Sequence, residues 1–475
     1  MKSTFRRKRI AIVLAGILGG GAVLGVTFVG PWPTYGKVEL EKTEYYREAL
    51  AAMARSAARS ERTATPGPLA AGWATGPMTL PSATPLAGYG SRGGRPATGV
   101  HDPLFVKALV LDDGRDRVAI VASDLLIVPP GIAEKVRTAV ARRLPLTADG
   151  ILFNASHTHS GPGAFAPGWV AGQFAGEYDP AVEAALAELM VGTIVRAYES
   201  RGPARLGRGR VKVREHVCNR TRRNAPIDPD LHFLLVEKDD RSRSIVVSYA
   251  AHPTLVGGDN MKWSAGYPGA LTRTLERELG GTALFLAGAM GSMGPRAPAG
   301  ETGFAATEAV GRCLALRLVA ELDGLVLDDR LEVASAGIAL EMPPLQVRWN
   351  RWLRLSPFLV RGLGVDNRAW LQGVRIGESV LIGTPSDFSG EISVELKAWA
   401  AELGWDLWVL SFNGDYIGYV SPDRYYTTAS RKGREGYEMY LMSWCGPQQA
   451  EYLVRLLRRM VEELAGGRTV GLEVP

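Results

Sequence analysis

Two histidines one residue apart are the side chains of this chain best suited to chemistry. The protein has only six histidines in 475 residues, and His157 and His159 both lie in the run Asn154–Gly163. The apolar residues before them predict a buried strand over 150–157, whose alternation would put both imidazoles on one face. Neutral imidazole is the commonest metal ligand and also the usual acid or base near neutral pH. The pattern therefore predicts a metal or acid–base site, with a hydrogen-bonded pair of histidines at a turn as the alternative.

A third histidine occupies a similar position in another predicted strand. His252 follows the apolar run 244–250 and precedes Pro253. Two strands that carry histidines at their ends can bring metal ligands together. His252 is therefore predicted to join the His157 site.

The predicted elements alternate between strands and helices along most of the chain, which indicates an α/β fold with mixed β-sheets flanked by helices. Strands are predicted at 105–111, 117–123, 150–157, 204–216, 231–238, 244–250, 283–286, 330–340, 373–383 and 407–411. Helices are predicted at 37–62, 131–144, 181–199, 267–279, 304–323, 389–403 and 447–465. Residues 63–86, rich in Pro, Gly, Ala and Thr, are predicted to form a loop or linker.

The composition is that of a globular protein, with 46% hydrophobic and 22% charged residues. The net charge of +6 arises partly in the first nine residues and does not indicate nucleic-acid binding. Cys218, Cys313 and Cys445 are too few for a disulfide framework, which leaves one bridge or three thiols. No Gly-x-Ser-x-Gly motif is evident, which argues against a serine hydrolase.

The N-terminus has the pattern of a membrane anchor. A basic tail over 1–9 precedes an uncharged run from Ile10 to Gly30, about the length that spans a bilayer. The basic flank predicts a cytoplasmic N-terminus and an extracytoplasmic catalytic domain, with a cleaved signal peptide as the alternative. Glycines spaced four apart at 16/20 and 21/25 suggest a homodimer through this transmembrane helix. The expected organisation is then tail 1–9, transmembrane anchor 10–30, helix and linker 31–86, and catalytic domain 87–475.

The segment 347–355 mixes arginine with tryptophan and leucine. Such side chains suit a boundary between lipid and water. An ordinary surface segment with buried tryptophans is the alternative.

The run Asn154–Gly163 resembles the signature of the neutral/alkaline non-lysosomal ceramidases. Further groups that resemble the family follow in the family's order: Gly88-Tyr89-Gly90 with 99–104, Ala251–Thr254 with Tyr267-Pro268-Gly269, and Ile417–Val420. The resemblance implies a hydrolase that cleaves the N-acyl amide of ceramide or a related lipid. It also implies one zinc ion held by two histidines, a glutamate and a tyrosine.

The motif matches assign the metal-binding roles to His157, His252 and Tyr419, with Asp387 as the carboxylate. The family's Pro-Gly-Glu is Pro-Ser-Asp at 385–387, so Glu391 is an alternative carboxylate. Two imidazoles, a carboxylate and a phenol leave an open position for water.

The same resemblance implies substrate roles for three other residues. His159 would transfer a proton, and Arg220 and Tyr437 would face the substrate carbonyl. A surface salt bridge is the alternative for Arg220. Gly294 replaces a serine of the family's Gly-Asp-Val-Ser-Pro block, which favours attack by metal-activated water over an acyl-enzyme. The chain reaches Pro475 soon after the last family motif, so a C-terminal β-domain is not expected.

Two other functions fit the same residues. One is a zinc hydrolase of another envelope amide or ester. The other is a catalytically silent, membrane-anchored binding protein, suggested by the replacements at Asp387 and Gly294. The expected partners are a ceramide-like lipid and the membrane.

Overall fold

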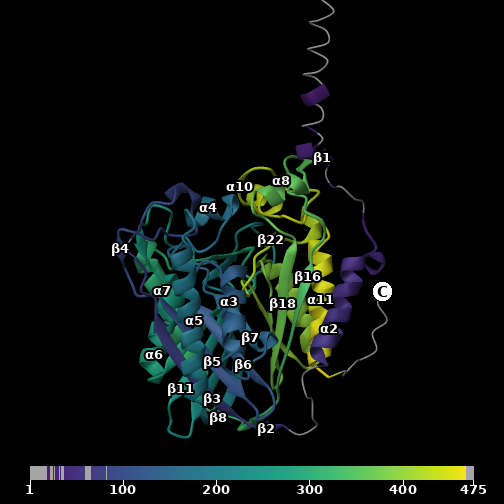
Figure 1. The fold of residues 1–475 in the computed structure, drawn as a ribbon. Coiled ribbons are helices and arrows are strands. Elements are labelled where there is room, and N and C mark those ends of the chain that lie inside the picture. Colours follow the sequence, from purple (N-terminus) through teal and green to yellow (C-terminus); the bar gives the residue numbers. More distant parts are fainter. Residues whose placement is uncertain are drawn as a thin grey trace, which may run out of the picture.

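Two β-sheets packed face to face form the centre of the protein, and helices cover both outer faces (Figure 1). This computed structural model describes residues 19–21, 25, 27–31, 33, 37–58, 66–81 and 83–466. The arrangement confirms the predicted mixed α/β fold with sheets flanked by helices.

The larger sheet has eight strands, and the smaller sheet has four. In spatial order the larger sheet contains β13 (Thr282–Ala287), β11 (Arg243–Tyr249), β10 (Asp230–Lys238), β8 (Gly202–Lys212), β3 (Ala70–Pro77), β5 (Phe105–Asp112), β6 (Arg117–Ser123) and β7 (Ile151–Ala155). The smaller sheet contains β16 (Val333–Glu341), β18 (Arg368–Ile376), β19 (Ser379–Gly383) and β21 (Asp406–Leu410). Leu109 of the larger sheet and Leu381 of the smaller one are fully buried in the core between them.

The longer helices lie in two outer layers (Figure 1). The larger sheet packs against α3 (Pro130–Ala141), α5 (Pro180–Glu199), α6 (Gly266–Leu279) and α7 (Gly303–Val319). The smaller sheet packs against α2 (Glu44–Ala57), α9 (Gly390–Glu402) and α11 (Gln449–Leu464). The order of layers is therefore helix, sheet, sheet, helix, and each sheet buries both of its faces.

Short elements connect these layers. The two-stranded pairs are β1 (Val29–Pro31) with β17 (Leu353–Leu355), β2 (Gly67–Pro68) with β15 (Arg330–Leu331), β4 (Gly99–Val100) with β12 (Lys262–Trp263), β9 (Val217–Asn219) with β14 (Met293–Pro295), and β20 (Asp387–Phe388) with β22 (Tyr419–Val420). The short helices are α4 (Trp169–Ala175), α8 (Pro357–Gly362) and α10 (Gly433–Gly436), followed by a π-helical turn at Tyr437–Leu441.

The linker prediction for residues 63–86 is wrong over Ala70–Pro77, which form β3 inside the larger sheet. The strand is rich in small residues because α5 lies directly on it. A Cβ at Gly72 would stand 2.2 Å from the Ala197 carbonyl oxygen, and one at Gly76 would stand 2.5 Å from the Thr193 hydroxyl. Small residues that look like a loop in sequence here allow a close contact between helix and strand.

Two further boundaries differ from the predictions. The predicted strand at 373–383 is an antiparallel pair, β18 and β19, joined by a turn at Gly377, whose φ is +59°. The predicted helix at 37–62 begins only at Glu44. All three cysteines are free thiols, and only Cys445 is buried.

Most of the predicted membrane segment 10–30 lies outside the described residues. Its last two residues, Val29 and Gly30, belong to β1, so the predicted boundary is wrong at that end. Across the described parts of the chain, no helix combines the length and the apolar character needed to cross a bilayer.

Candidate metal centre

The carboxyl ends of strands from both sheets meet at one place. The pairs β6–β7, β11–β13 and β19–β21 are each parallel, so both strands of a pair end on the same side. His157 follows β7, His252 follows β11 and Asp387 follows β19. Side chains that are distant in sequence are thereby brought to one sheet edge, the usual place for a site in an α/β fold.

Asn154 ties the two sheets together beside this edge. Its Nδ2 donates to the Ser411 carbonyl oxygen at 2.6 Å, and its Oδ1 accepts from the Ala287 amide at 2.6 Å. Ser411 follows β21 of the smaller sheet, and Ala287 ends β13 of the larger one. The first residue of the Asn154–Gly163 motif therefore fixes the relative position of the sheets that carry the site.

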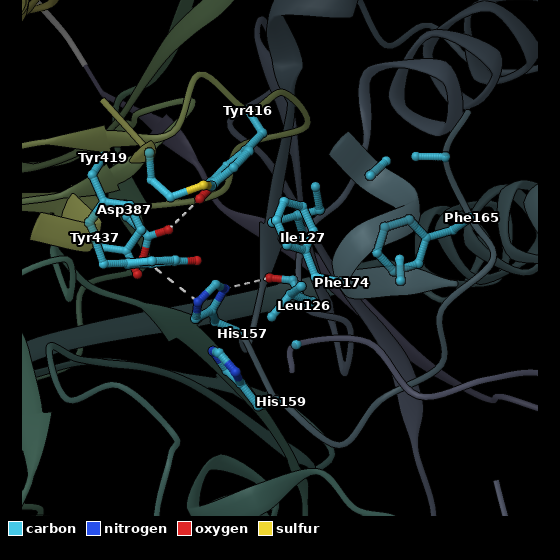
Figure 2. A pocket seen from close by; sticks show the side chains of 15 residues that line it. Leu126, Ile127, His157, His159, Phe165, Phe174, Asp387, Tyr416, Tyr419 and Tyr437 are labelled. Atoms are coloured by element: carbon cyan, nitrogen blue, oxygen red, sulfur yellow. Dashed lines mark hydrogen bonds and ion pairs between the residues drawn. The ribbon is translucent and has the colours of Figure 1, made fainter. Parts of the chain in front are cut away.

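Three imidazoles converge at the strand ends (Figure 2 shows two of them, His157 and His159). Nε2 of His252 lies 3.0 Å from Nε2 of His157 and 3.1 Å from Nε2 of His159. The three residues form a group of ligand atoms within 4.8 Å of one another that can hold a metal ion. His159, predicted to transfer a proton, thus lies in the same cluster as the two predicted histidine ligands.

Two of these rings are oriented by backbone carbonyls. Nδ1 of His157 lies 2.7 Å from the Leu126 oxygen, and Nδ1 of His252 lies 3.3 Å from the Met290 oxygen. A carbonyl only accepts, so each Nδ1 carries the proton and each Nε2 presents a lone pair. Two lone pairs 3.0 Å apart repel each other unless a cation lies between them. Carbonyl-oriented imidazoles of this kind are typical of metal ligands.

Burial keeps all three imidazoles neutral. It lowers the pKa of His157 to about 3 and holds the pKa values of His159 and His252 well below the ordinary value, with the Arg220 charge adding to the effect for both. At neutral pH the cluster therefore offers unprotonated nitrogens, the form that a metal ion needs.

A carboxylate completes the group. Oδ1 of Asp387 lies 3.6 Å from Nε2 of His157, is buried, and has no hydrogen-bond partner (Figure 2). Its other oxygen accepts from the Tyr416 hydroxyl at 2.7 Å. Burial raises the pKa of Asp387 to about 6, against the opposing effects of the Tyr416 hydrogen bond and the Arg220 charge. A buried, unpartnered carboxylate oxygen beside imidazole lone pairs fits a cation.

The alternative carboxylate, Glu391, lies outside this group. Its oxygens accept from Asn219 at 2.9 Å, from Arg424 at 3.1 Å and from Tyr425 at 2.5 Å. Because these hydrogen bonds occupy both oxygens, the geometry favours Asp387 over Glu391.

The backbone at His157 corrects the predicted strand. β7 ends at Ala155, and His157 adopts a φ of +59°, so strand alternation does not orient the two imidazoles. Phe412 has a φ of +60°, and its ring stacks on the His157 ring at 4.0 Å with an interplanar angle of 3°. Left-handed backbone at non-glycine residues is unfavourable and concentrates at functional sites.

Arg220 connects the predicted tyrosine to the cluster. Its Nη2 donates to the Tyr419 hydroxyl at 2.9 Å and its Nε to the Gly291 carbonyl oxygen at 3.1 Å. Nε also lies 3.5 Å from Oε1 of Glu438, and Nη1 is buried without a partner. The side chain is only 8% exposed, so the surface salt bridge considered for Arg220 is wrong.

The phenols of Tyr419 and Tyr437 lie beside Asp387 (Figure 2). The two rings are 5.6 Å apart at an interplanar angle of 77°. Burial raises the pKa of Tyr437 to about 12 and holds the pKa of Tyr419 well above its ordinary value. Both hydroxyls are protonated at neutral pH, and the structure brings together all seven residues predicted for the site.

Three contacts around the site come from residues to which the sequence analysis gave no role in the site. Tyr416 donates to Asp387, and Arg92 donates from Nη1 to the His159 carbonyl oxygen at 2.5 Å. Gly88, in the predicted Gly-Tyr-Gly group, has a φ of +108°, and a Cβ there would stand 2.8 Å from the His159 ring. The position of Tyr416 next to the Ile417–Val420 motif was the available clue.

Two cavities that share lining residues reach the cluster. A small cavity of about 50 Å³ is lined by His157, His159, Asp387, Tyr416 and Tyr419 together with apolar side chains such as Leu126 and Phe165 (Figure 2). A larger, mainly apolar cavity of about 870 Å³ shares His159 and Tyr419 with it. Its size is in the range of small-molecule binding sites. Part of the cluster thus lines the wall of a mainly apolar cavity.

Gly294 lies on β14, opposite Cys218 of β9. A Cβ there would stand 3.1 Å from the Cβ of Arg220. The position thus offers no nucleophile, and a side chain there would press on Arg220.

The fold and the buried imidazole cluster define an α/β protein with a site able to hold a metal ion. Residues 71–289 match the family model of the neutral/alkaline non-lysosomal ceramidases, N-terminal part. The predicted resemblance is confirmed there.

One curated relative is similar to part of this chain, and two solved structures share its fold. A neutral ceramidase of Mycobacterium tuberculosis is 26% identical over 226 residues, which cover 43% of this chain and 34% of the relative. The match therefore spans about a third of that relative. The neutral ceramidase structure from Pseudomonas aeruginosa superposes with a TM-score of 0.71 at 19% identity, over 86% of this chain and 76% of that one. A ceramidase complexed with C2 gives a TM-score of 0.70 at 18% identity, over 83% and 75%.

Proposed function

We propose that this protein is a zinc-dependent amidohydrolase that cleaves the N-acyl amide of ceramide or a related lipid. One observation carries the proposal: two carbonyl-oriented imidazoles, His157 and His252, present lone pairs to each other beside the unpartnered oxygen of Asp387. The family match and the apolar cavity in front of this group support an amide with long apolar chains as substrate.

His157, His252 and Asp387 would hold the metal ion, with the Tyr419 hydroxyl at the edge of the group. Nitrogen and carboxylate ligands of this kind suit zinc. When bound, zinc supplies an activated water as nucleophile and polarises the substrate carbonyl. His159 differs from the other two imidazoles because its Nδ1 is buried without a partner. Its ring is therefore not fixed by a carbonyl and is available to carry a proton.

The other side chains act on the substrate. The unpartnered Nη1 of Arg220 is a donor for the carbonyl oxygen as negative charge develops on it, and the Tyr437 hydroxyl is a second donor. His159, which is neutral at the start, takes a proton from the attacking water and delivers it to the leaving amine. Because Gly294 provides no hydroxyl, no acyl-enzyme can form at this position, which favours direct attack by water.

We further propose that the chain is a single-pass membrane protein with its N-terminus in the cytoplasm and the catalytic domain outside. The basic residues of 1–9 and the uncharged run that follows support this orientation. A reporter enzyme fused after residue 466 should be active only on the extracytoplasmic side; activity in the cytoplasm would contradict the orientation.

The central experiment combines metal analysis of the full chain with hydrolysis of a panel of labelled N-acylsphingosines. The wild type should contain zinc and release fatty acid, and His157→Ala should lose both. His216→Ala is the control, since His216 is also buried but bonds the Arg296 carbonyl outside the cluster. Absence of metal from the wild type would refute the proposal.

Adding other envelope amides and esters to the panel separates the alternatives. Cleavage of another envelope amide or ester, but of no N-acylsphingosine, would assign a different substrate to the same site. Bound zinc with no cleavage of any member would indicate the binding protein suggested by the replacements at Asp387 and Gly294.

A further inference from the structure

Large apolar side chains gather around the opening of the larger cavity, the one of about 870 Å³. Of the nine large hydrophobic residues that are substantially exposed in the described part of the chain, six belong to segments at this opening. They are Trp169, Trp349, Trp352, Leu353, Phe358 and Leu441, and we call them the apolar rim. Trp169, Trp349 and Leu441 also line the cavity itself. A concentration of exposed apolar side chains at one opening marks an interaction surface.

Positively charged side chains surround the apolar rim. Residues 347–363 contain four arginines and no aspartate or glutamate. Arg348 is buried and donates to the Tyr426 carbonyl oxygen at 2.7 Å, whereas Arg351 is exposed and lies 4.2 Å over the Trp352 ring. Across the opening, residues 431–434 add three exposed cations. Tryptophan and arginine together suit the boundary between lipid and water, and the cations attract anionic headgroups.

The N-terminal part of the chain joins the same face. β1 pairs with β17, the Phe28 carbonyl oxygen accepts from the Ser356 amide at 2.9 Å, and the Phe28 and Phe358 rings lie 6.2 Å apart. The residues before Phe28 are those predicted to form the membrane anchor. In Figure 1, β1, α4, α8 and α10 lie at one end of the molecule. The predicted anchor therefore joins the domain on the same face that carries the cavity opening.

We propose that the apolar rim is a docking surface for a bilayer containing anionic lipid, and that it places the cavity opening on the membrane. Trp352 and Phe358 enter the lipid boundary, and the surrounding arginines bind headgroups. A lipid amide then passes from the bilayer into the cavity without crossing water; this last step rests on the proposed amidohydrolase function. The docking itself does not depend on that function.

Docking is tested on the full chain reconstituted into phosphatidylcholine vesicles, with and without phosphatidylserine, that carry a brominated lipid as quencher. Trp352→Phe should lose a measurable part of the tryptophan quenching seen in the wild type. Trp73→Phe, on β3 and outside the rim, should lose none. Arg351→Gln should lower the ratio of docked to undocked domain ~5-fold in phosphatidylserine membranes. Equal quenching in the wild type and Trp352→Phe would overturn the proposal.

Lipid entry is tested with the double variant Trp352→Ser/Phe358→Ser, because neither residue lines the cavity that reaches the cluster. Hydrolysis of a long-chain N-acyl lipid in vesicles should fall ~10-fold through the apparent KM. Hydrolysis of a short-chain, water-dispersed analogue should not change. Equal losses on both substrates would overturn direct entry. If the wild type cleaves neither substrate although its Trp352 is quenched by the brominated lipid, the proposed function fails and the docking surface stands.

Discussion

The convergence of the imidazoles predicts that the protein is measurably more stable with zinc than without it. Nε2 of His157 and Nε2 of His252 lie 3.0 Å apart with both Nδ1 protons committed to carbonyl oxygens. Without a cation, folding buries two facing lone pairs and the unpartnered oxygen of Asp387. Because this arrangement exists only in the folded chain, zinc binds the folded state and raises the free energy of unfolding.

The size of the effect follows from mass action. At a free zinc concentration of a hundred times Kd, the folded chain gains about 2.7 kcal/mol relative to chelator. If His252→Ala raises Kd a hundredfold, the same zinc concentration stabilises it by only about 0.4 kcal/mol. His216→Ala removes another buried imidazole, one outside the cluster, and should keep the full gain.

The assay is urea unfolding of the full chain, followed by tryptophan fluorescence, with zinc buffered at a known free concentration and with chelator. The comparison is between the zinc-dependent gains of the three proteins, so the stability cost of each substitution itself cancels. The reasoning is refuted if zinc does not stabilise the wild type, or if His252→Ala gains as much as His216→Ala does.

Three other perturbations test neighbouring parts of the site. Burial raises the pKa of Asp387 to about 6 in the metal-free protein, so below this pH the carboxyl must release a proton to bind metal. Zinc affinity, measured by titration, should therefore fall about tenfold per pH unit below pH 6, and Asp387→Asn should bind zinc more weakly but without this pH dependence. In Arg220→Lys the lysine ammonium cannot bond both the Gly291 oxygen and the Tyr419 hydroxyl and still leave a donor for the substrate, so kcat should fall about 10²–10³-fold at unchanged zinc content. An unchanged kcat would show that this donor takes no part in the reaction. Gly88→Ala places a methyl group 2.8 Å from the His159 ring at a φ of +108°, so the free energy of unfolding should fall by about 2–4 kcal/mol in chemical denaturation and turnover should fall with it.

The elements that the sequence predicted best are those with strong apolar runs. The strands predicted at 105–111 and 117–123 and the helix at 181–199 match β5, β6 and α5 to within a residue at each end. These segments bury one or both faces along their whole length, so their periodicity records their structure directly. β3 was missed because its small residues respond to the approach of α5, a contact that local sequence does not encode.

The residues of the site could be predicted from the sequence where each of them lies in a recognisable motif. The convergence of His157 and His252 followed from two strands with histidines at their ends, and their approach to 3.0 Å agrees with it. The orientation of the His157 ring did not follow from alternation, because the residue leaves the strand with a φ of +59°. In that conformation the His157 ring stacks on the ring of Phe412, a residue that follows β21 of the smaller sheet.

The two halves of the site come from different parts of the chain. The three imidazoles and Arg220 lie within residues 71–289, the region that the family model matches and that contains nearly the whole larger sheet. Asp387 and Tyr419 follow strands of the smaller sheet, outside that match. The metal group is therefore complete only when the sheets pack together, and Asn154 joins them by bonds to Ala287 and to Ser411. Asn154, the first residue of the histidine motif, thus has a structural role. By bonding both sheets it holds the imidazoles of one near the carboxylate of the other, the two groups that would share a metal ion.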